Sequence, residues 1–200
     1  MDVFEAVNQR RSIRKFKDMP VAYEMLEKCV DAARLAPTAR NCQLLEFIIV
    51  DNEEMVPRVL DAVGSYAGRS RPEKGWQSGG RPKAYIVTLI NNQRVAEYKS
   101  NRNNTDHDVG LAVENMILVA QAQGIGTFTI GSFDHDKLGQ VLNIPETHEV
   151  VLGVGLGFPD ESPVLEVATE SIERWVDDKG VRHIPKRRLQ DIVHRNSFVS

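Results

Sequence analysis

Cysteine is scarce in this sequence: Cys29 and Cys42 are the only two among 200 residues. They form no Cys-x-x-Cys pair and have no histidine at metal-ligand spacing, so the sequence predicts neither a disulfide framework nor a zinc or iron–sulfur site. The five histidines show no His-x-His or His-Glu-x-x-His spacing. This removes support for metal-dependent hydrolysis and for a histidine-centred triad. Any cofactor is therefore expected to be organic, and no metal is expected.

Long apolar runs and a surplus of positive charge are also missing. The longest apolar runs, such as 47–50 and 150–156, fall far short of the roughly 20 residues that a membrane-spanning helix needs. The first residues lack the basic and apolar regions of a secretory signal, which predicts a cytoplasmic protein without a membrane partner. A net charge of −3 argues against general nucleic-acid binding.

What is present fits an ordinary globular chain, with 42% hydrophobic and 26% charged residues. The length favours a single domain over residues 1–200, with a C-terminal arm from about residue 172. Hydrophobic spacing predicts helices separated by short apolar strands, and hence a mixed α/β chain whose sheet is covered by helices. We predict helices over residues 2–9, 21–36, 53–63, 108–124 and 134–142, and strands over 46–50, 84–90, 127–130 and 150–156.

The strongest predicted helix begins near Asp108 and ends at Gly124, a typical residue after a helix C-terminus. Its apolar stripe comprises Val109, Ala112, Val113, Met116, Ile117 and Ala120. Residues 64–82 and 91–106 are predicted as a long loop and a polar segment, regions that often carry substrate selection. The tail from residue 172 favours either one last helix or an extended arm.

Two basic clusters lie at opposite ends of this acidic chain, Arg10/Arg11/Arg14/Lys15 and Lys186/Arg187/Arg188. Arginine forks and a serine hydroxyl beside a helix end can hold a phosphate through bidentate hydrogen bonds. Charge runs are more often solvated surface, so spacing alone favours that simpler interpretation.

A polar turn (Ala36–Gln43) separates a predicted helix from a predicted strand. Its amide side chains can hydrogen-bond a planar heterocycle, although the segment by itself favours a simpler interpretation, a turn that caps the helix. Gly153–Gly157 lacks the Gly-x-Gly-x-x-Gly spacing, and the prolines that follow cannot open a phosphate-binding helix. We therefore interpret it as a tightly packed strand, and Cys42 as a packing residue.

The basic motif (Arg10–Phe16) reads Arg-Arg-Ser-Ile-Arg-Lys-Phe and resembles the R-R-S-x-R-x-F motif of the FMN-dependent nitroreductase family. The polar turn resembles the family's A-P-S-x-x-N-x-Q motif, with Thr38 in place of its serine. The resemblance covers the chain from Val3 to about Leu189. Further matching segments are 108–112, 115–116, 124–127, 130–133, 155–159 and 185–188.

The resemblance implies an α+β fold with a mostly antiparallel central sheet flanked by helices. It also implies an intertwined homodimer that holds two FMN molecules at its interface. Arg10 and Arg11, with Lys186 and Arg188, would hold the FMN phosphate, while Ser12 and Arg14 would reach the ribityl chain and the pyrimidine edge. A backbone amide in Gly131-Ser132 would face flavin N5. The second subunit would contribute Pro37, Thr38, Ala39, Asn41 and Gln43.

The activity implied by the resemblance is ping-pong hydride transfer from NADH or NADPH through flavin N5 to a nitroaromatic, a quinone or a similar small electron acceptor. No catalytic side chain is required, because the flavin carries the chemistry. The same motifs also fit enone reduction, dehydrogenation, dehalogenation, flavin cleavage or a flavin-binding sensor without turnover. A structural domain without flavin is disfavoured because the basic motif and the polar turn are intact.

Substrate selection is the least defined part of this hypothesis. Trp76 and Phe133 are candidates to stack on an aromatic substrate, and packing of its own loop explains Trp76 equally well. Leu44-Leu45 replaces the Pro-Trp that commonly follows the polar turn in the family. The aromatic surface there is lost, which predicts a substrate pocket of different shape.

Overall fold

The computed structural model describes residues 1–64 and 80–198. It divides into two compact units, residues 1–160 and 161–200, and each is described by itself. Within the described ranges, no helix has both the length and the apolar character that crossing a membrane requires.

The first unit is built on a four-stranded sheet in which every neighbouring pair of strands is antiparallel. The strand order is β1-β2-β4-β3, so β1 and β3 form opposite edges. The antiparallel sheet predicted from the resemblance is confirmed. The strands are β1 (Leu45–Val50), β2 (Ala84–Asn91), β3 (Gly126–Ile130) and β4 (His148–Gly157).

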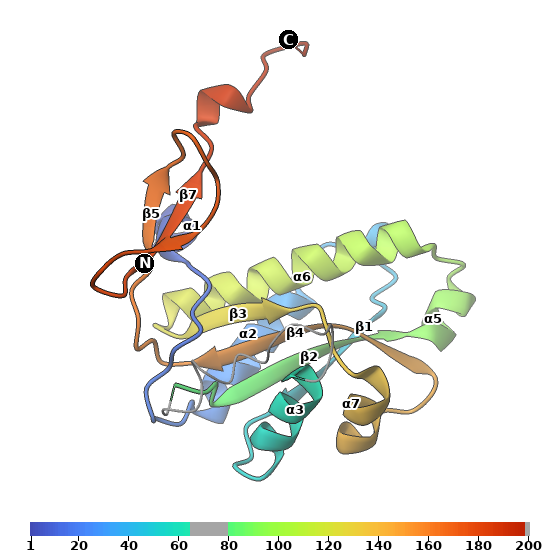
Figure 1. The fold of residues 1–200 in the computed structure, drawn as a ribbon. Helices are drawn as coiled ribbons and strands as arrows, with labels where there is room; N and C mark the ends of the chain where they lie inside the picture. The colour runs from blue at the N-terminus through green and yellow to red at the C-terminus, as the bar shows by residue number, and fades with distance from the viewer. Residues whose placement is uncertain (65–79, 199–200) are drawn as a thin grey trace. The chain divides into compact units, whose positions relative to one another are not determined.

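Helices cover both faces of this sheet (Figure 1). Helices α2 (Tyr23–Arg34) and α6 (Arg102–Ala122) pack on one face, and α3 (Met55–Gly64) and α7 (His135–Leu142) on the other. Side chains of β2 alternate between the two cores: Ile86 and Ile90 face α2 and α6, whereas Val87 faces α3 and α7. The predicted apolar stripe of α6 is buried, as expected for a helix that faces a sheet.

Polar side chains cap several helices where the sequence predicts their starts. Asp2 accepts a hydrogen bond from the backbone N–H of Glu5 at 2.8 Å, which caps α1 (Val3–Gln9). Asp134 caps α7 in the same way through the N–H of Lys137, at 3.0 Å. Gly124 follows α6 with a φ of +77°, a left-handed conformation that glycine adopts without strain.

The prediction of a polar, loop-like segment over 91–106 is wrong. This segment holds α5 (Asn92–Glu97) and the first turn of α6, which begins at Arg102 and not near Asp108. Asn91 and Asn101 cap these helices, and Arg102 pairs with Asp106 at 2.8 Å. Capping and ion pairing, rather than a buried apolar stripe, stabilise both helix starts, so hydrophobic spacing gave no signal there.

The second unit contains a small sheet that the sequence analysis did not predict. Its strands are β5 (Val164–Val167), β6 (Trp175–Val176) and β7 (Arg182–Lys186), with β7 parallel to β5 and antiparallel to β6. Trp175 stacks on His183 with ring centroids 3.9 Å apart. Glu166 accepts a hydrogen bond from the Trp175 indole at 2.7 Å. Such short strands, joined by side-chain contacts, have too few residues to show an alternating pattern.

Three glycines of β4 give aromatic rings direct access to the strand backbone. A Cβ atom at Gly155 would lie 2.8 Å from Cζ of Phe128, and one at Gly157 would lie 2.7 Å from Cδ1 of Phe16. At Gly153 the nearest atom would be Cζ of Phe133, at 2.9 Å. The predicted tight packing of this Gly-x-Gly-x-Gly tract is confirmed, because any larger residue would overlap a buried ring.

We expect Gly155→Ala to lower the free energy of unfolding by about 1–3 kcal/mol, because the added methyl group overlaps the Phe128 ring. The matched control is Gly139→Ala in α7, where a Cβ atom meets nothing within 4 Å. That change should raise the free energy of unfolding by roughly 0.5–1 kcal/mol through helix propensity. Urea denaturation measures both effects. The double variant Gly155→Ala/Phe128→Leu should regain part of the loss, and a neutral Gly155→Ala would contradict the packing argument.

Candidate functional site

The basic motif runs beside β3 and is fixed to it by backbone pairing. Ser12 forms a parallel bridge with Thr127, and the N–H of Ile13 donates to the Thr127 carbonyl at 2.8 Å. Ile13 is buried against the bare backbone of Gly126, where a Cβ atom would lie 2.8 Å from its Cγ1. Phe16 is buried as well. These two apolar anchors hold the polar residues of the motif at the surface.

Arg10 and Arg11 lie at the C-terminal end of α1, side by side and partly buried. Arg11 donates hydrogen bonds to the backbone carbonyls of Arg10 and Asn8, the latter at 2.7 Å. The Nε atoms of both arginines are buried and have no hydrogen-bond partner among the described residues. Burial, and then the charge of Arg10, lower the pKa of Arg11. A bound anion would satisfy the two donors and offset the repulsion, so this pair fits a phosphate group.

The polar turn has a strained backbone. Arg40, Asn41 and Gln43 have φ values of 52°, 56° and 50°, so three of the six described non-glycine residues with positive φ lie in this turn. Left-handed conformations are uncommon for residues with a Cβ atom, and they persist only where the surroundings enforce them. Such strain is often found at functional sites, which makes the turn a candidate for one.

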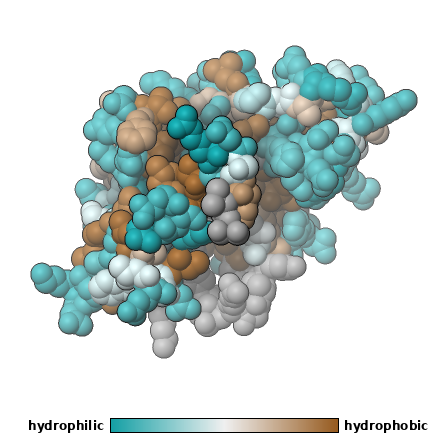
Figure 2. Space-filling view, turned by 90° about the horizontal axis from the view of Figure 1, so that it is seen from above, coloured by the Kyte–Doolittle hydropathy of each residue, from teal (hydrophilic) through white to brown (hydrophobic). Residues whose placement is uncertain are grey.

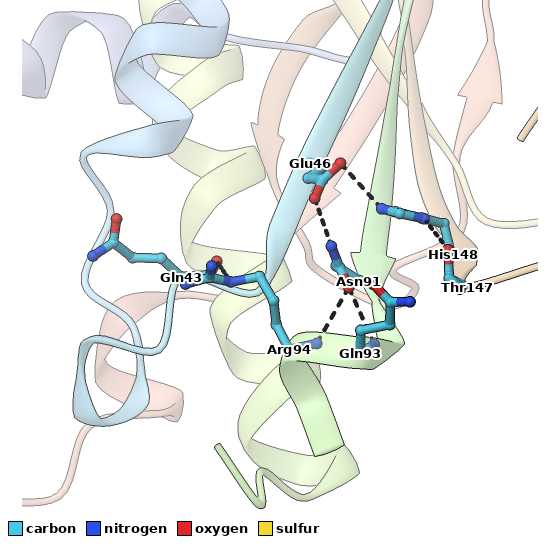
Figure 3. Close-up of polar contacts among 7 residues, drawn as sticks. All are labelled: Gln43, Glu46, Asn91, Gln93, Arg94, Thr147 and His148. Carbon is cyan, nitrogen blue, oxygen red and sulfur yellow. Dashed lines mark hydrogen bonds and ion pairs between the residues drawn. The ribbon is translucent and has the colours of Figure 1, made fainter. Parts of the chain in front are cut away.

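Two charged side chains bind the backbone of the polar turn. The carboxylate of Asp108, on α6, accepts from the N–H of Ala39 at 3.0 Å. Arg94, on α5, donates from Nε to the Gln43 carbonyl at 3.1 Å (Figure 3). Its Nη2 donates to the Cys42 carbonyl, also at 3.1 Å. The turn is therefore held by side chains from two neighbouring helices.

The side chains predicted to contact the cofactor stay accessible in this turn. Pro37, Asn41 and Gln43 are exposed, and Thr38 and Ala39 are partly buried. The Gln43 amide points away from β1 and β2 (Figure 3). The turn thus presents two side-chain amides outward while its backbone is held from behind.

Gly131 and Ser132 follow directly after β3 and are exposed. Phe133, the next residue, is 1% exposed and packs against Gly153 in the core. The expectation that Phe133 stacks on a substrate is therefore wrong, because its ring anchors this segment inside the protein. Trp76 lies outside the described residues, as does most of its predicted loop.

Within one chain, the structure does not bring the basic motif and the polar turn together. The basic motif lies beside β3, whereas the turn leads into β1 at the opposite edge of the sheet. Three strand spacings of about 4.8 Å separate these edges, or about 14 Å. A site that uses both therefore requires either a ligand that spans the sheet or a second copy of the chain.

Lys186 and Arg188 belong to the second unit. Lys186 ends β7 and is exposed. Arg188 forms a two-pronged contact with the Asp191 carboxylate at 3.0 and 3.1 Å, and this contact raises the pKa of Arg188. The predicted phosphate contacts of Lys186 and Arg188 stay predictions.

A cleft of about 360 Å³ adjoins the polar turn. Leu45 and Phe47 of β1 form part of its apolar wall, and Thr38, Gln43 and Arg94 contribute polar groups. Leu44, by contrast, is fully buried in the core. Of the two leucines that replace the family's Pro-Trp, Leu45 is therefore the one that shapes an accessible surface.

Sequence reasoning missed the two residues that hold the turn. Asp108 is 3% exposed although it is charged, and its place on the buried face of α6 was the available signal. Arg94 had no such signal, because its contacts depend on a helix that the sequence did not predict.

Neither cysteine thiol gains a role in this site. Burial raises the pKa of Cys29 to about 11, so its thiol stays protonated near neutral pH. Cys42 is 1% exposed, as expected for a packing residue. Across residues 1–64 and 80–198, no group of three or more His, Cys, Asp or Glu side chains is arranged to hold a metal ion.

Comparison with known proteins identifies the family of this chain. The nitroreductase family model matches residues 7–158. A protein of Methanothermobacter thermautotrophicus, provisionally named NADH dehydrogenase/NAD(P)H nitroreductase, is 30% identical over 185 residues, which cover 88% of each chain.

Solved structures share the fold. A nitroreductase family protein from Clostridium novyi is 26% identical, with a TM-score of 0.68 over 81% of this chain and 87% of that one. An FMN-dependent nitroreductase from Clostridium difficile is 22% identical, with a TM-score of 0.65 over 98% and 99% of the two chains. The family match spans both the basic motif and the polar turn, and the chain therefore belongs to the nitroreductase family.

Proposed function

We propose that this protein is an FMN-dependent oxidoreductase that uses NADH or NADPH to reduce small electron-poor acceptors such as nitroaromatics or quinones. The observation that carries the proposal is the partly buried pair Arg10 and Arg11, whose Nε donors lack partners among the described residues. Names of family members support the cofactor and the donor: one relative is called an NAD(P)H nitroreductase, and one solved structure an FMN-dependent nitroreductase.

The donor groups of the basic motif fit FMN in charge. Arg10 and Arg11 would hold its phosphate, joined by Lys186 and Arg188 of the second unit. A phosphate suits such donors because it accepts several charge-assisted hydrogen bonds at once. Ser12, which follows the arginines along β3, would contact the ribityl chain. The proposed roles thus follow the order of residues along the basic motif.

FMN, when bound, would supply a hydride acceptor at N5 for ping-pong redox chemistry between NADH or NADPH and a small electron acceptor. Arg14 would place a positive charge at the pyrimidine edge, where reduction adds negative charge. A backbone N–H of Gly131 or Ser132 would donate to N5. No side chain is assigned as an acid or base, because the protein supplies orientation and charge in this chemistry.

We further propose a homodimer in which the polar turn of one copy meets the basic motif of the other. Pro37, Thr38, Ala39, Asn41 and Gln43 would then contact FMN from the second subunit. The placement of the two segments at opposite edges of one sheet supports this arrangement.

Exposed apolar surface in the first unit also supports a homodimer. On α1, Val3, Phe4 and Val7 are 75%, 77% and 47% exposed. A groove of about 330 Å³ between α1, α2 and α6 adds Leu35 and Leu118 to this surface. Figure 2, seen from above, shows patches of apolar surface among hydrophilic side chains. Surface of this kind is typical of an interface between proteins. The cytoplasmic location stays a prediction.

The purified protein should be yellow, and the released chromophore should co-migrate with FMN on chromatography. Anaerobic addition of NADH or NADPH should bleach it within a turnover, and a quinone or nitroaromatic should restore the colour. Bound FMN that stays oxidised with both donors would favour a flavin sensor over an enzyme. A colourless protein that cannot be loaded with FMN would refute the proposed function.

Arg10→Ala and Lys186→Ala should each raise the dissociation constant for FMN by about tenfold or more, because each removes a charge-assisted contact to the phosphate. Fluorescence quenching of added FMN measures this constant. Arg58→Ala is the matched control, since Arg58 is exposed on α3, where it donates to the Met55 sulfur at 3.4 Å. Unchanged affinity in both test variants would remove the proposed phosphate site.

Light scattering should give twice the chain mass of 22.5 kDa for the FMN-loaded protein, because a complete site is expected to need two copies. Substituting the exposed apolar side chain of Phe4 with Glu should shift the equilibrium toward monomer and lower FMN retention together. A monomer that retains FMN with wild-type affinity would exclude the shared site.

A further inference from the structure

We propose that Arg94 is a positioning residue that fixes the polar turn in its cofactor-contacting conformation before FMN arrives. The inference rests on the proposed role of the turn in binding FMN. Arg94 lies on α5 and is not one of the side chains expected to touch the cofactor. Its proposed action is on the backbone of the turn.

The backbone of the polar turn is strained. Positive φ values occur at three of the four residues from 40 to 43, namely Arg40, Asn41 and Gln43. This conformation is disfavoured for residues with a Cβ atom, less for asparagine than for arginine or glutamine, so it needs compensation from outside the turn. Arg94 supplies such compensation through its two hydrogen bonds to the carbonyls of Cys42 and Gln43.

Hydrogen bonds at the start of α5 fix the position from which the Arg94 side chain extends. Asn91 ends β2 and caps α5, accepting from the N–H groups of Gln93 and Arg94 at 3.1 and 3.2 Å. Its side-chain amide donates to Glu46 on β1 at 2.8 Å. Nε2 of His148, on β4, lies 3.1 Å from the other Glu46 oxygen (Figure 3). The start of α5 is thus tied to three strands, which fixes the origin of the Arg94 side chain.

Glu46 remains an effective acceptor in this network. The hydrogen bond from Asn91 is the main cause that lowers the pKa of Glu46, and His148 and Arg94 act in the same direction. The carboxylate is therefore charged near neutral pH, where charge-assisted hydrogen bonds are strongest.

A further hydrogen bond connects α5 with the turn. Arg40, itself in the turn, donates to the carbonyl of Tyr98, the C-cap residue of α5. The Arg94 guanidinium lies 5.4 Å from the centre of the Tyr98 ring. Helix α5 and the turn therefore hold each other at two points. The turn is ordered as part of folding, and FMN does not have to order it on binding.

The test compares Arg94→Met and Arg94→Lys with the wild type. Methionine keeps much of the length and removes every donor, whereas lysine keeps the charge but lacks the planar fork that reaches two carbonyls. Arg58→Met is the matched control, because it makes the same change at an exposed arginine of α3, which packs on the other face of the sheet from α2 and α6. The readouts are amide hydrogen exchange over residues 38–44 in FMN-free protein and the dissociation constant for FMN.

Two amides report directly on the turn: the N–H of Ala39, bonded to Asp108, and the N–H of Gln43, bonded to Thr38. We expect Arg94→Met to speed their exchange and to raise the FMN dissociation constant about tenfold. Arg94→Lys should give an intermediate effect on both, and Arg58→Met none. Circular dichroism checks that the fold is kept, and Arg94→Lys serves where Arg94→Met does not fold.

The outcomes separate this inference from the proposed function. Exchange and FMN affinity that stay at wild-type values in both Arg94 variants would overturn the positioning role while leaving FMN binding intact. A wild-type protein that does not bind FMN would instead overturn the proposed function, and the exchange data alone would then decide whether Arg94 holds the turn. In a third outcome, Arg94→Lys behaves as the wild type while Arg94→Met does not. This result would show that the positive charge, and not the planar guanidinium, holds the turn, and it also contradicts the proposed role of the two hydrogen bonds.

Discussion

Contact between the bare backbone of β4 and buried aromatic rings determines where the candidate site can form. Phe16 ends the basic motif and packs against Gly157, while Phe133 follows Gly131 and Ser132 and packs against Gly153. Both rings are 1% exposed, so the two segments proposed to contact FMN are each fixed by a neighbouring side chain in the core. Segments anchored in this way cannot shift easily, because a close-packed interior allows buried side chains few alternative positions. The glycines of β4 thus act on the site through the aromatic rings that they accommodate.

Charged side chains are placed differently on the two sides of the proposed site, the basic motif and the polar turn. Arg10 and Arg11 repel each other while partly buried, an arrangement that an anion would stabilise. The polar turn instead has its charged partners behind it, Arg94 and Asp108, each bonded to backbone. One side thus offers charge to a ligand, and the other offers neutral amides. FMN has a matching asymmetry, with an anionic phosphate at one end and a polar, uncharged ring edge at the other.

The parts of the structure that the sequence predicted well are those with strong periodic or capping signals. The α6 stripe and the Asp2 and Asp134 caps were readable because each depends on residues close together in the chain. The glycine strand was readable from its own tract, although the rings that pack on it lie far away in the sequence. The basic motif and the polar turn were located by resemblance, since spacing alone favoured solvated charge and a capping turn. Helix α5, the first turn of α6 and the small second sheet were missed because polar caps and single side-chain contacts hold them. Arg94 could not be found, since its role exists only once α5 and the turn are adjacent.

The residue types in the polar turn also bear on its role in binding. Where φ is positive, glycine adopts the conformation without the steric cost that a Cβ atom adds. The turn nevertheless has Arg40, Asn41 and Gln43 at these positions. Arg40 compensates through its hydrogen bond to Tyr98, so its side chain has a structural reason to be there. Asn41 and Gln43 are exposed, and the Gln43 amide makes one contact with the turn itself, at 3.5 Å to the Asn41 carbonyl. Asparagine tolerates a positive φ better than most residues, so the backbone of the turn accounts for Asn41. The Gln43 amide has no such explanation, whereas binding to a heterocycle with hydrogen-bonding edges would use it.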